Sequence, residues 1–419
     1  MSKEVTLKTP GRWRSGGSVP GRCRQHVTSS CSAVLALVVA LAGLSTAKTG
    51  AGEDTSEYLK YYNVEASVGV AEQMLKAKNV SKESRAYRLA VMLLFSHPLT
   101  DMTYGPCLKT CLQMYASNLL PETPTDIFLF VKQEHLMDII QTPWITSTPN
   151  MYVIVLDETD SRSWKMPTWI RPEDKGWSGG FTYEYRLMGQ WRLAFSFPFI
   201  KELGYKYMLQ SDSDTFITTP IKFNMVQHMQ DNNLWMTNRP ATVLEQYQYY
   251  QGLPELASFW LVTRKPTNGQ IINKDNAEGY GISPDLFDTI YPHDITGLRF
   301  REGDPGRNPA TDPTGRKGWL AKLVAGNFNA FSIDWWFSQD VQDFVQLVLR
   351  TGAHIEHRWV DIATETMVRD LFCPLSHFHT YDPALVSIEH GKGLNPLCRR
   401  SPDWLAHRNN SADPVMPPA

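Results

Sequence analysis

The sequence predicts an α/β fold whose mostly parallel central sheet is covered by helices on both faces. Short runs of continuous apolar residues recur along the middle of the chain, and stretches with helical spacing separate them. Strands buried on both faces have this continuous apolar character, and parallel neighbours need a helical crossover between them. The chain has 419 residues, 42% of them hydrophobic, so it can bury a large core, which excludes disorder for most of its length.

The first half of the predicted sheet comes from three apolar runs. Residues 87–95, 125–131 and 151–156 are predicted to be strands, and a helix is predicted over 108–119 between the first two. Continuous apolar runs of this length fit strands better than helices.

A helix, a strand and a pair of acids follow in the middle of the chain. The helix is predicted by apolar residues at helical spacing: Leu187, Trp191, Ala194 and Phe195. Pro198 should kink or restart it, and Gly204 is suited to its C-terminus. Residues 205–210 form the next predicted strand, which leads directly into Asp212-Ser213-Asp214.

The last part of the chain predicts a long excursion and a helix. Residues 265–320 are rich in Gly, Pro and Asp and predict a long functional or mobile loop. The helix is predicted by apolar residues that share one face, Phe337, Val341, Phe344, Val345 and Val348, and Gly352 should end it.

The N-terminal region predicts membrane attachment. Residues 1–31 contain six Lys or Arg and one Glu, a net charge of +5, so the remainder carries −2 − 5 = −7. The uncharged stretch that follows predicts a transmembrane signal-anchor over 32–47, with the basic tail in the cytosol. A cleaved signal peptide is the alternative, and a bipartite presequence is a weaker one. We expect a luminal stem over 48–80, a catalytic domain over 81–402 and a flexible tail over 403–419.

Other features agree with a luminal location. Asn79 and Asn409 begin glycosylation sequons. The body of the chain has four cysteines, Cys107, Cys111, Cys373 and Cys398, which predict two disulfides or, less favoured, a zinc site. The near-neutral overall charge argues against nucleic acid as the main partner.

The two acids after the fourth predicted strand indicate a metal site. Ligands of open α/β sheets bind at the carboxyl ends of the strands. Asp212 and Asp214, separated by one residue, can both bind a hard divalent cation, which can neutralise a diphosphate. The structural alternative is an Asx-turn or a helix N-cap. In a luminal chain, a metal-bound diphosphate favours a nucleotide-sugar substrate.

Short motifs in a fixed order extend this interpretation. They are Tyr185-Arg-Leu-Met-Gly-Gln-Trp-Arg192, Asp212-Ser-Asp214, Asn327-Phe-Asn329, His357-Arg-Trp-Val-Asp-Ile-Ala363 and Ile388-Glu-His390. In order and spacing they resemble the Y-R-x-M-x-R, E-P-D, N-F-E, E-R-W-G-D-A and G-Y-x-H motifs of glycosyltransferase family 15. That family contains the fungal-type Golgi α-1,2-mannosyltransferases, and the resemblance covers roughly residues 85–400.

The resemblance implies a GT-A fold, a Rossmann-like nucleotide-binding half continuous with an acceptor-binding half. It implies a retaining, metal-dependent transfer of mannose from GDP-mannose to a sugar hydroxyl of a glycoprotein glycan. Mn²⁺ would be the cofactor. The location would be the Golgi membrane, with single-pass type II topology and a luminal catalytic domain.

The resemblance also assigns metal ligands. Asp212 takes the place of the metal-binding acid, Asp214 completes the pair, and His390 takes the place of the metal-binding histidine. Neutral imidazole is a good Mn²⁺ ligand beside carboxylates. Because the match is gapped there, His377 and His379 compete with His390.

Further residues correspond to positions that contact the substrates. Tyr185, Arg186 and Arg192 would bind the donor, the arginines through the diphosphate, with Tyr185 also near the chemistry. Asp361 would contact or deprotonate the acceptor hydroxyl. The structural alternatives are a core tyrosine, exposed helical charges and a helix N-cap at Asp361. Trp359 is expected in the core, with stacking against a sugar ring as the alternative.

Two positions depart from the family pattern. Asn329 stands where the family has its proposed glutamate nucleophile, and an amide cannot form the glycosyl ester. Transfer on the front face of the sugar needs no such residue, and Asn329 would then stabilise an oxocarbenium-like state through its carbonyl. Gln190 replaces an arginine, which removes one cationic donor.

Two other classes of function remain open from the sequence. A luminal metal-dependent hydrolase of sugar or phosphate esters would need a dense metal-ligand motif, and none such as H-E-x-x-H occurs in the sequence. A non-catalytic carbohydrate-binding relative is the other, suggested by Asn329.

Overall fold

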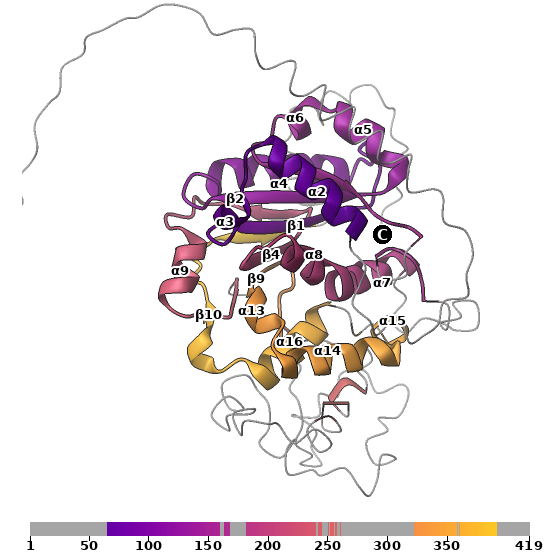
Figure 1. Ribbon diagram of the computed structural model, residues 1–419, viewed down its shortest axis with the longest axis vertical. Coiled ribbons are helices and arrows are strands. Elements are labelled where there is room, and N and C mark those ends of the chain that lie inside the picture. Colours follow the sequence, from indigo (N-terminus) through magenta and orange to yellow (C-terminus); the bar gives the residue numbers. More distant parts are fainter. Residues whose placement is uncertain are drawn as a thin grey trace, which may run out of the picture.

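The computed structural model describes most of the chain between residues 65 and 391 (Figure 1). The described residues are 65–159, 163–167, 182–239, 242–244, 250, 252–254, 256–257, 260, 322–357, 359 and 361–391. The predicted anchor at 32–47, the tail at 403–419 and the excursion at 265–320 lie outside them. Within the described part, no helix has the length and apolar character needed to cross a bilayer.

A seven-stranded sheet forms the centre of the described fold, in the order β10-β6-β9-β4-β1-β2-β3. Its strands are β1 (Leu89–Phe95), β2 (Thr125–Val131), β3 (Met151–Val155), β4 (Tyr207–Asp212), β6 (Met236–Asn238), β9 (Phe328–Ser332) and β10 (Phe378–Thr380). Only the β4–β9 and β6–β9 pairs are antiparallel, which confirms the predicted mostly parallel sheet. Two small antiparallel sheets join β5 (Thr215–Ile217) to β11 (Ile388–His390) and β7 (Thr242–Leu244) to β8 (Lys322–Val324).

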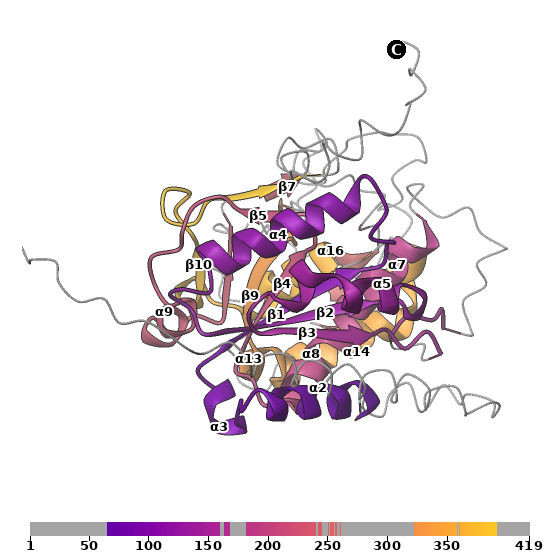
Figure 2. The same ribbon diagram turned by 90° about the horizontal axis from the view of Figure 1, so that it is seen from above.

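Helices cover both faces of this sheet. The helices of the described part include α2 (Glu65–Ala77), α3 (Lys82–Arg85), α4 (Tyr104–Asn118), α5 (Leu136–Gln141), α6 (Pro143–Thr146), α7 (Tyr183–Gln190), α8 (Phe197–Glu202), α9 (Met225–Asp231), α13 (Ile333–Trp336), α14 (Gln339–Thr351), α15 (Ala353–Glu356) and α16 (Asp361–Phe372). Figure 2 shows α4 on one face of the sheet and α2, α8 and α13 on the other. The apolar strands therefore lie in the core, and β1 and β2 are buried almost throughout.

The N-terminal helix α2 extends the fold into the region expected to be a stem. Ala71 and Leu75 are fully buried, and α2 packs against β3 and α8. Arg85 of α3 binds the Glu72 carboxylate at 2.7 Å and the Leu203 carbonyl at 2.8 Å. Residues 65–80 of the expected stem are thus part of the folded domain.

The predicted start of β4 is displaced because the preceding helix ends in a glycine motif. Gly204 has φ +84°, and the amide of Tyr205 donates to Ile200 O at 3.3 Å. This Schellman-type closure keeps residue 205 in the helix end. The strand consequently begins at Tyr207 and continues to Asp212.

Pro198 restarts the helix, as predicted, and a π-helical turn over Trp191–Ser196 precedes it. Proline has no N–H, so it cannot donate to the carbonyl four residues earlier. Within the π-helical turn, Ser196 Oγ donates to Arg192 O at 2.5 Å. Such turns recur at functional sites, and this one carries Arg192 toward the end of β4.

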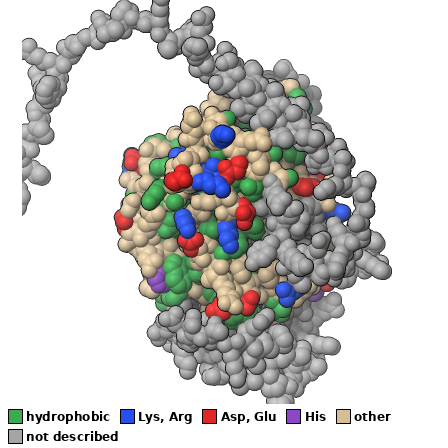
Figure 3. Space-filling model, in the orientation of Figure 1, with side chains coloured by type: hydrophobic (Ala, Val, Ile, Leu, Met, Phe, Trp, Pro, Cys, Tyr) green, Lys and Arg blue, Asp and Glu red, His purple; other side chains and the backbone are tan. Residues whose placement is uncertain are grey.

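The C-terminal helix prediction is confirmed from Gln339 onward, but Phe337, which was expected on the same helix, lies at the end of α13. Helix α14 buries Val341, Phe344 and Val348 on one face, and Gly352 ends it with φ +69°. On the face seen in Figure 3, acidic and basic side chains are intermixed where the described residues are visible.

The cysteines correct one prediction. Cys107 is disulfide-bonded, but Cys111 and Cys373 are buried thiols. The prediction of two disulfides among the four body cysteines is therefore wrong. Cys398 lies outside the described residues. Burial raises the pKa of the Cys111 thiol well above its usual value, with Asp214 adding to the effect, so a metal-binding thiolate is disfavoured there.

Candidate metal and donor site

Asp212 and Asp214 lie where the central sheet ends. Asp212 is the last residue of β4, and Asp214 follows in the turn to β5. The apolar run of β4 is buried, whereas the turn residues lie at the carboxyl edge of the sheet, where α/β folds bind ligands.

A long-range strand pairing brings His390 to these acids. Strand β11 pairs antiparallel with β5, and His390 is the register partner of Thr215. Two hydrogen bonds between Thr218 and Ser387 extend the ladder. The Thr218 amide donates to the Ser387 carbonyl at 2.9 Å, and the Thr218 hydroxyl donates to the Ser387 hydroxyl at 2.7 Å. Because β5 directly follows the acid pair, this register places the imidazole beside both carboxylates.

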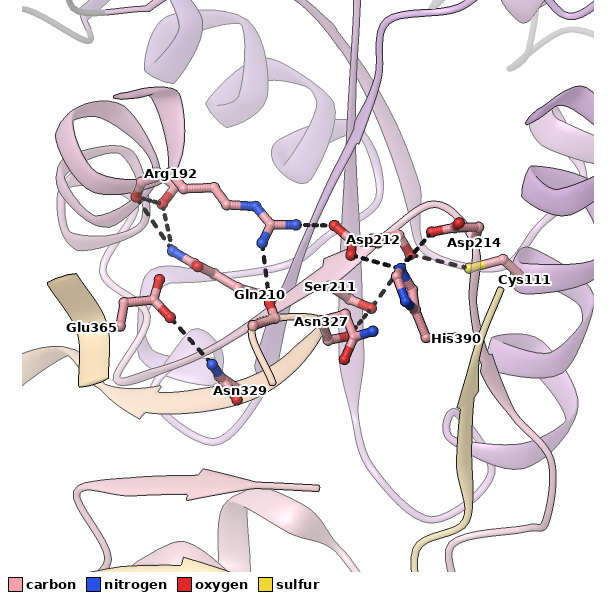
Figure 4. Close-up of polar contacts among 12 residues, drawn as sticks. Cys111, Arg192, Gln210, Ser211, Asp212, Asp214, Asn327, Asn329, Glu365 and His390 are labelled. Carbon is pink, nitrogen blue, oxygen red and sulfur yellow. Dashed lines mark hydrogen bonds and ion pairs between the residues drawn. The ribbon is translucent and has the colours of Figure 1, made fainter. Parts of the chain in front are cut away.

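The three side chains converge (Figure 4). His390 Nε2 lies 3.1 Å from Asp212 Oδ2 and 3.2 Å from Asp214 Oδ1. One ligand atom from each residue lies within 4.8 Å of the others. The other oxygen of Asp212, Oδ1, accepts a hydrogen bond from Arg192 Nη2.

The charges at this site are strongly coupled. For His390, burial opposes protonation, but hydrogen bonds to Asp212 and Asp214 outweigh it and raise the pKa to about 9. For Asp212, burial opposes ionisation, but the charge of Arg192 and the contact with His390 lower the pKa to about 2. In the metal-free protein, the imidazole is therefore protonated at neutral pH and lies between the two acids.

The same three groups fit a divalent cation. Carboxylate oxygens and an imidazole nitrogen are suitable ligands for Mn²⁺. The proton on His390 occupies the place that a metal would take, since both need the Nε2 lone pair between the two carboxylates.

A buried hydrogen-bond chain supports the end of β4 from the other face. Tyr115 OH donates to Ser211 Oγ at 2.6 Å, and Ser211 Oγ donates to Asn327 O at 3.0 Å. The chain links α4, β4 and the turn before β9, so it fixes the backbone that presents Asp212.

The two predicted arginines differ in their surroundings. Arg192 is buried and also donates to Gly326 O at 3.0 Å, which ties the β8–β9 turn to Asp212. Arg186 is buried too, but its guanidinium donates to the last carbonyls of α15, those of Ile355 and Glu356. The structure thus brings Arg192 to the acids and gives Arg186 a contact that joins α7 to α15.

Other predicted residues are placed as follows. Tyr185 lies half-buried in the first turn of α7, where its amide donates to the N-cap Thr182 at 3.3 Å. Asp361 begins α16, and its side chain lies outside the described part. Trp359 is buried, as expected for the core. The roles in catalysis or donor binding of Tyr185 and Asp361 stay predictions.

The competing histidines lie elsewhere. His377 stacks on Trp235 with ring centroids 4.1 Å apart. His379 belongs to β10, an edge strand of the central sheet. Its ring lies edge-on to that of His228, with the centroids 5.3 Å apart. Within the described ranges, the group of three or more potential metal ligands contains His390 and neither of these residues.

Asn329 and Gln190 both lie inside the protein. Asn329 is fully buried on β9, and its Nδ2 donates to Glu365 Oε2 of α16 at 3.2 Å. Gln190 is also fully buried and donates to Lys165 O at 3.2 Å. The glutamine thus fills an interior position in α7.

Two residues near the site were missed from the sequence. Arg239 follows β6, and its Nη1 donates to Ile388 O of β11 at 3.4 Å. Burial lowers the pKa of Arg239, and the negative charge of Asp212 opposes this shift, so the two groups share one electrostatic environment. Glu365 lies in a helix with no motif of its own. The sequence marks Glu365 only as a charged residue among uncharged neighbours, and that pattern has many structural explanations.

No protein-family model matches the chain, and a search of curated proteins also gave no match. Solved structures do match. The mannosyltransferase Ktr4p from S. cerevisiae has a TM-score of 0.55 and 13% identity, covering 87% of this chain and 86% of that one. Its complex with GDP has a TM-score of 0.53, 12% identity and the same coverage. Core-mannan synthase A (CmsA/Ktr4) from Aspergillus fumigatus, in an Mn/GDP form, has a TM-score of 0.52 and 14% identity, covering 75% and 77% of the two chains. The chain therefore has the glycosyltransferase fold of these fungal mannosyltransferases, in line with the resemblance found in its sequence.

Proposed function

We propose that this protein is a metal-dependent glycosyltransferase that moves mannose from GDP-mannose to a sugar hydroxyl of a glycan, with retention at C1. One observation carries the proposal: Asp212, Asp214 and His390 converge at the carboxyl edge of the sheet in this fold. The structures that share the fold include Mn/GDP and GDP forms of mannosyltransferases.

The chain's own residues supply a diphosphate site. Asp212, Asp214 and His390 would hold Mn²⁺, which when bound neutralises the donor diphosphate and stabilises the leaving nucleotide. Arg192 keeps one oxygen of Asp212 engaged and so fixes the orientation of the carboxylate. Arg239, at the same edge, offers a guanidinium to the diphosphate.

Retention of the configuration at C1 leaves two routes from donor to product. Either the acceptor attacks on the face that the nucleotide leaves, or a carboxylate first takes the sugar and is then displaced. Asn329 cannot act as that carboxylate. Asp361, at the start of α16, remains a candidate contact to the acceptor hydroxyl, and Tyr185 a candidate contact to the donor.

We further propose a Golgi location with type II topology. The support is the basic segment 1–31 followed by the uncharged stretch at 32–47. The disulfide at Cys107 is also typical of an oxidising compartment. A protease-protection assay on microsomes should leave the body of the chain intact, and its digestion without detergent would contradict this topology.

The activity is tested with the purified full-length chain and a panel of nucleotide-sugars. With Mn²⁺ and a mannoside acceptor, we expect transfer from GDP-mannose that stops with EDTA and returns with Mn²⁺. Hydrolysis of phosphate or sugar esters without transfer would indicate the hydrolase alternative. GDP-mannose or glycan binding without turnover would indicate a carbohydrate-binding protein.

A further inference from the structure

A buried carboxyl group lies beside Asn329. Glu365, in the second turn of α16, is fully buried and accepts the hydrogen bond from Asn329 Nδ2. Its neighbours fix the helix: Thr366 Oγ1 accepts from Val324 N at 3.1 Å, and Thr364 Oγ1 donates to Trp359 O at 2.7 Å. The position of Glu365 is therefore set by bonds to a strand and a loop on both sides of it.

This carboxyl group lies on the face of the sheet that carries Asp212. Asn329 is the register partner of Gln210, so their side chains share one face. Gln210 and Asp212 are two residues apart on β4 and share it too. Asn329 and Asp212 are thus diagonal neighbours, and diagonal neighbours in a sheet lie about 7–8 Å apart. Figure 4 shows Gln210 and Asn329 with Glu365 and Arg192.

Acceptor oxygens without partners surround the same place. Gln210 Oε1, Asn327 Oδ1 and Asn329 Oδ1 are buried and have no hydrogen-bond partner in the described structure. Buried oxygens of this kind are normally paired, so each needs a donor from elsewhere. Sugar hydroxyls supply several donors on adjacent carbons. A sugar ring that reached this face would bring donors to these oxygens.

We propose that Glu365 is the catalytic carboxylate of this enzyme and faces C1 of the donor sugar, whose hydroxyls bind Gln210, Asn327 and Asn329. The inference rests on the proposed retaining transfer. Asn329 then holds Glu365 in place by its amide N–H and leaves its own oxygen for the sugar. Asp212 and Asp214 are committed to the metal, so they do not compete for this role.

The reaction balances in two displacements. A carboxylate oxygen of Glu365 bonds to C1 while the bond from C1 to the β-phosphate oxygen breaks, and the electron pair leaves with GDP. The acceptor hydroxyl oxygen then bonds to C1 and breaks the glycosyl ester, which regenerates the carboxylate. The hydroxyl proton passes to a diphosphate oxygen of GDP. Two inversions give retention.

A glutamine at position 365 separates this role from a structural one. It has the shape of glutamate and still offers an oxygen to Asn329 Nδ2, but it cannot form a glycosyl ester. Burying a carboxyl group is costly, so a purely structural position would tolerate Glu365→Gln or gain stability from it. The matched control is Glu202→Gln, an exposed position at the end of α8.

The experiment measures mannose transfer by full-length wild type, Glu365→Gln and Glu202→Gln, with unfolding midpoints and GDP binding alongside. We expect Glu365→Gln to lower kcat at least about 10²-fold, with the GDP-mannose KM and the unfolding midpoint close to wild type. A kcat within about threefold of wild type would overturn the inference. An inactive wild type overturns the proposed function itself, which keeps the two failures distinct.

A second variant gives a signature that folding defects cannot produce. In Glu365→Ala, azide should enter the vacated space and attack C1 of GDP-mannose, displacing GDP and yielding mannosyl azide. Direct attack gives the inverted β-anomer, and we expect it only in this variant. Absence of the azide adduct from a folded, GDP-binding Glu365→Ala would overturn the inference even if Glu365→Gln proved unstable.

Discussion

His390 Nε2 lies 3.1 Å from Asp212 Oδ2, although the two residues belong to strands far apart in the sequence. The pairing of β11 with β5 brings them together, with His390 opposite Thr215. The metal site therefore depends on the three-residue ladder between β5 and β11, and anything that separates the two strands should remove the histidine from the site.

Replacement of Asp212 should abolish transfer. Asp212→Asn keeps the size of the side chain but removes the charge that a divalent cation and Arg192 need. We expect kcat/KM to fall at least about 10³-fold and Mn²⁺ affinity by more than about tenfold. Transfer assays and calorimetric titration with Mn²⁺ would measure the two effects.

The control for that variant is Asp334→Asn. Asp334 is exposed and pairs with Lys206 on the surface at 2.8 Å, away from the acids at the sheet edge. An exposed pair of this kind contributes at most about 1 kcal/mol, so activity should be unchanged. Full activity of Asp212→Asn would contradict the proposed metal site.

Metal binding should strengthen as the pH rises. The pKa of His390 is about 9 in the metal-free protein, so a proton must leave Nε2 whenever a cation binds at lower pH. We expect the Mn²⁺ dissociation constant to fall up to about tenfold per pH unit between pH 7 and 9. Titrations in buffers of different ionisation enthalpy should show about one proton released. A His390→Gln variant should lose this dependence.

The stability of the metal-free protein should follow the opposite trend. The folded-state pKa of His390 lies above its ordinary value of 6.5, so the protonated form is stabilised by folding. This contribution is fully present below pH 6.5 and is lost as the pH rises through about 9. Urea unfolding with EDTA across this range would measure it. A flat profile, equal to that of His390→Gln, would show that the imidazole is not held by the two acids.

Removal of the Arg192 guanidinium should destabilise the domain. Arg192→Met keeps the apolar contacts of the π-helical turn but leaves the Gly326 carbonyl and one oxygen of Asp212 without their donor. Breaking a buried pair costs about 3 kcal/mol, measurable as a lower midpoint of urea unfolding. Arg350→Met in the last turn of α14 is the control, because Arg350 is exposed. Equal midpoints for both variants would contradict the structural role of Arg192.

Arg239 should contribute to donor binding in addition to its bond to β11. Arg239→Gln removes a cation that shares the electrostatic environment of Asp212. Charge-assisted bonds to phosphate contribute roughly 1.5–3 kcal/mol, so we expect the KM for GDP-mannose to rise about tenfold or more. Inhibition by GDP should weaken in parallel, whereas binding of the acceptor alone should be unchanged. An unaltered GDP inhibition constant would exclude Arg239 from the diphosphate site.

The sequence by itself determined the local features. The apolar runs of β1 to β4 must be buried on both faces, which requires a mostly parallel sheet with helical crossovers. Gly204 and Gly352 set helix ends, because both adopt positive φ. Asp212 and Asp214, polar residues directly after an apolar strand, could only lie at its edge.

Only the tertiary structure decided which distant groups meet those acids. The place of His390 depends on the β5–β11 register, which is set by a pairing of short strands whose own sequences do not specify it. Arg239 bonds the backbone of β11, and Glu365 of α16 bonds Asn329, with no motif to mark either residue. Conversely, Arg186 bonds the end of α15 although its motif suggests the donor. Local sequence fixes the periodicity and caps of each element, but contacts between elements arise from packing the whole chain.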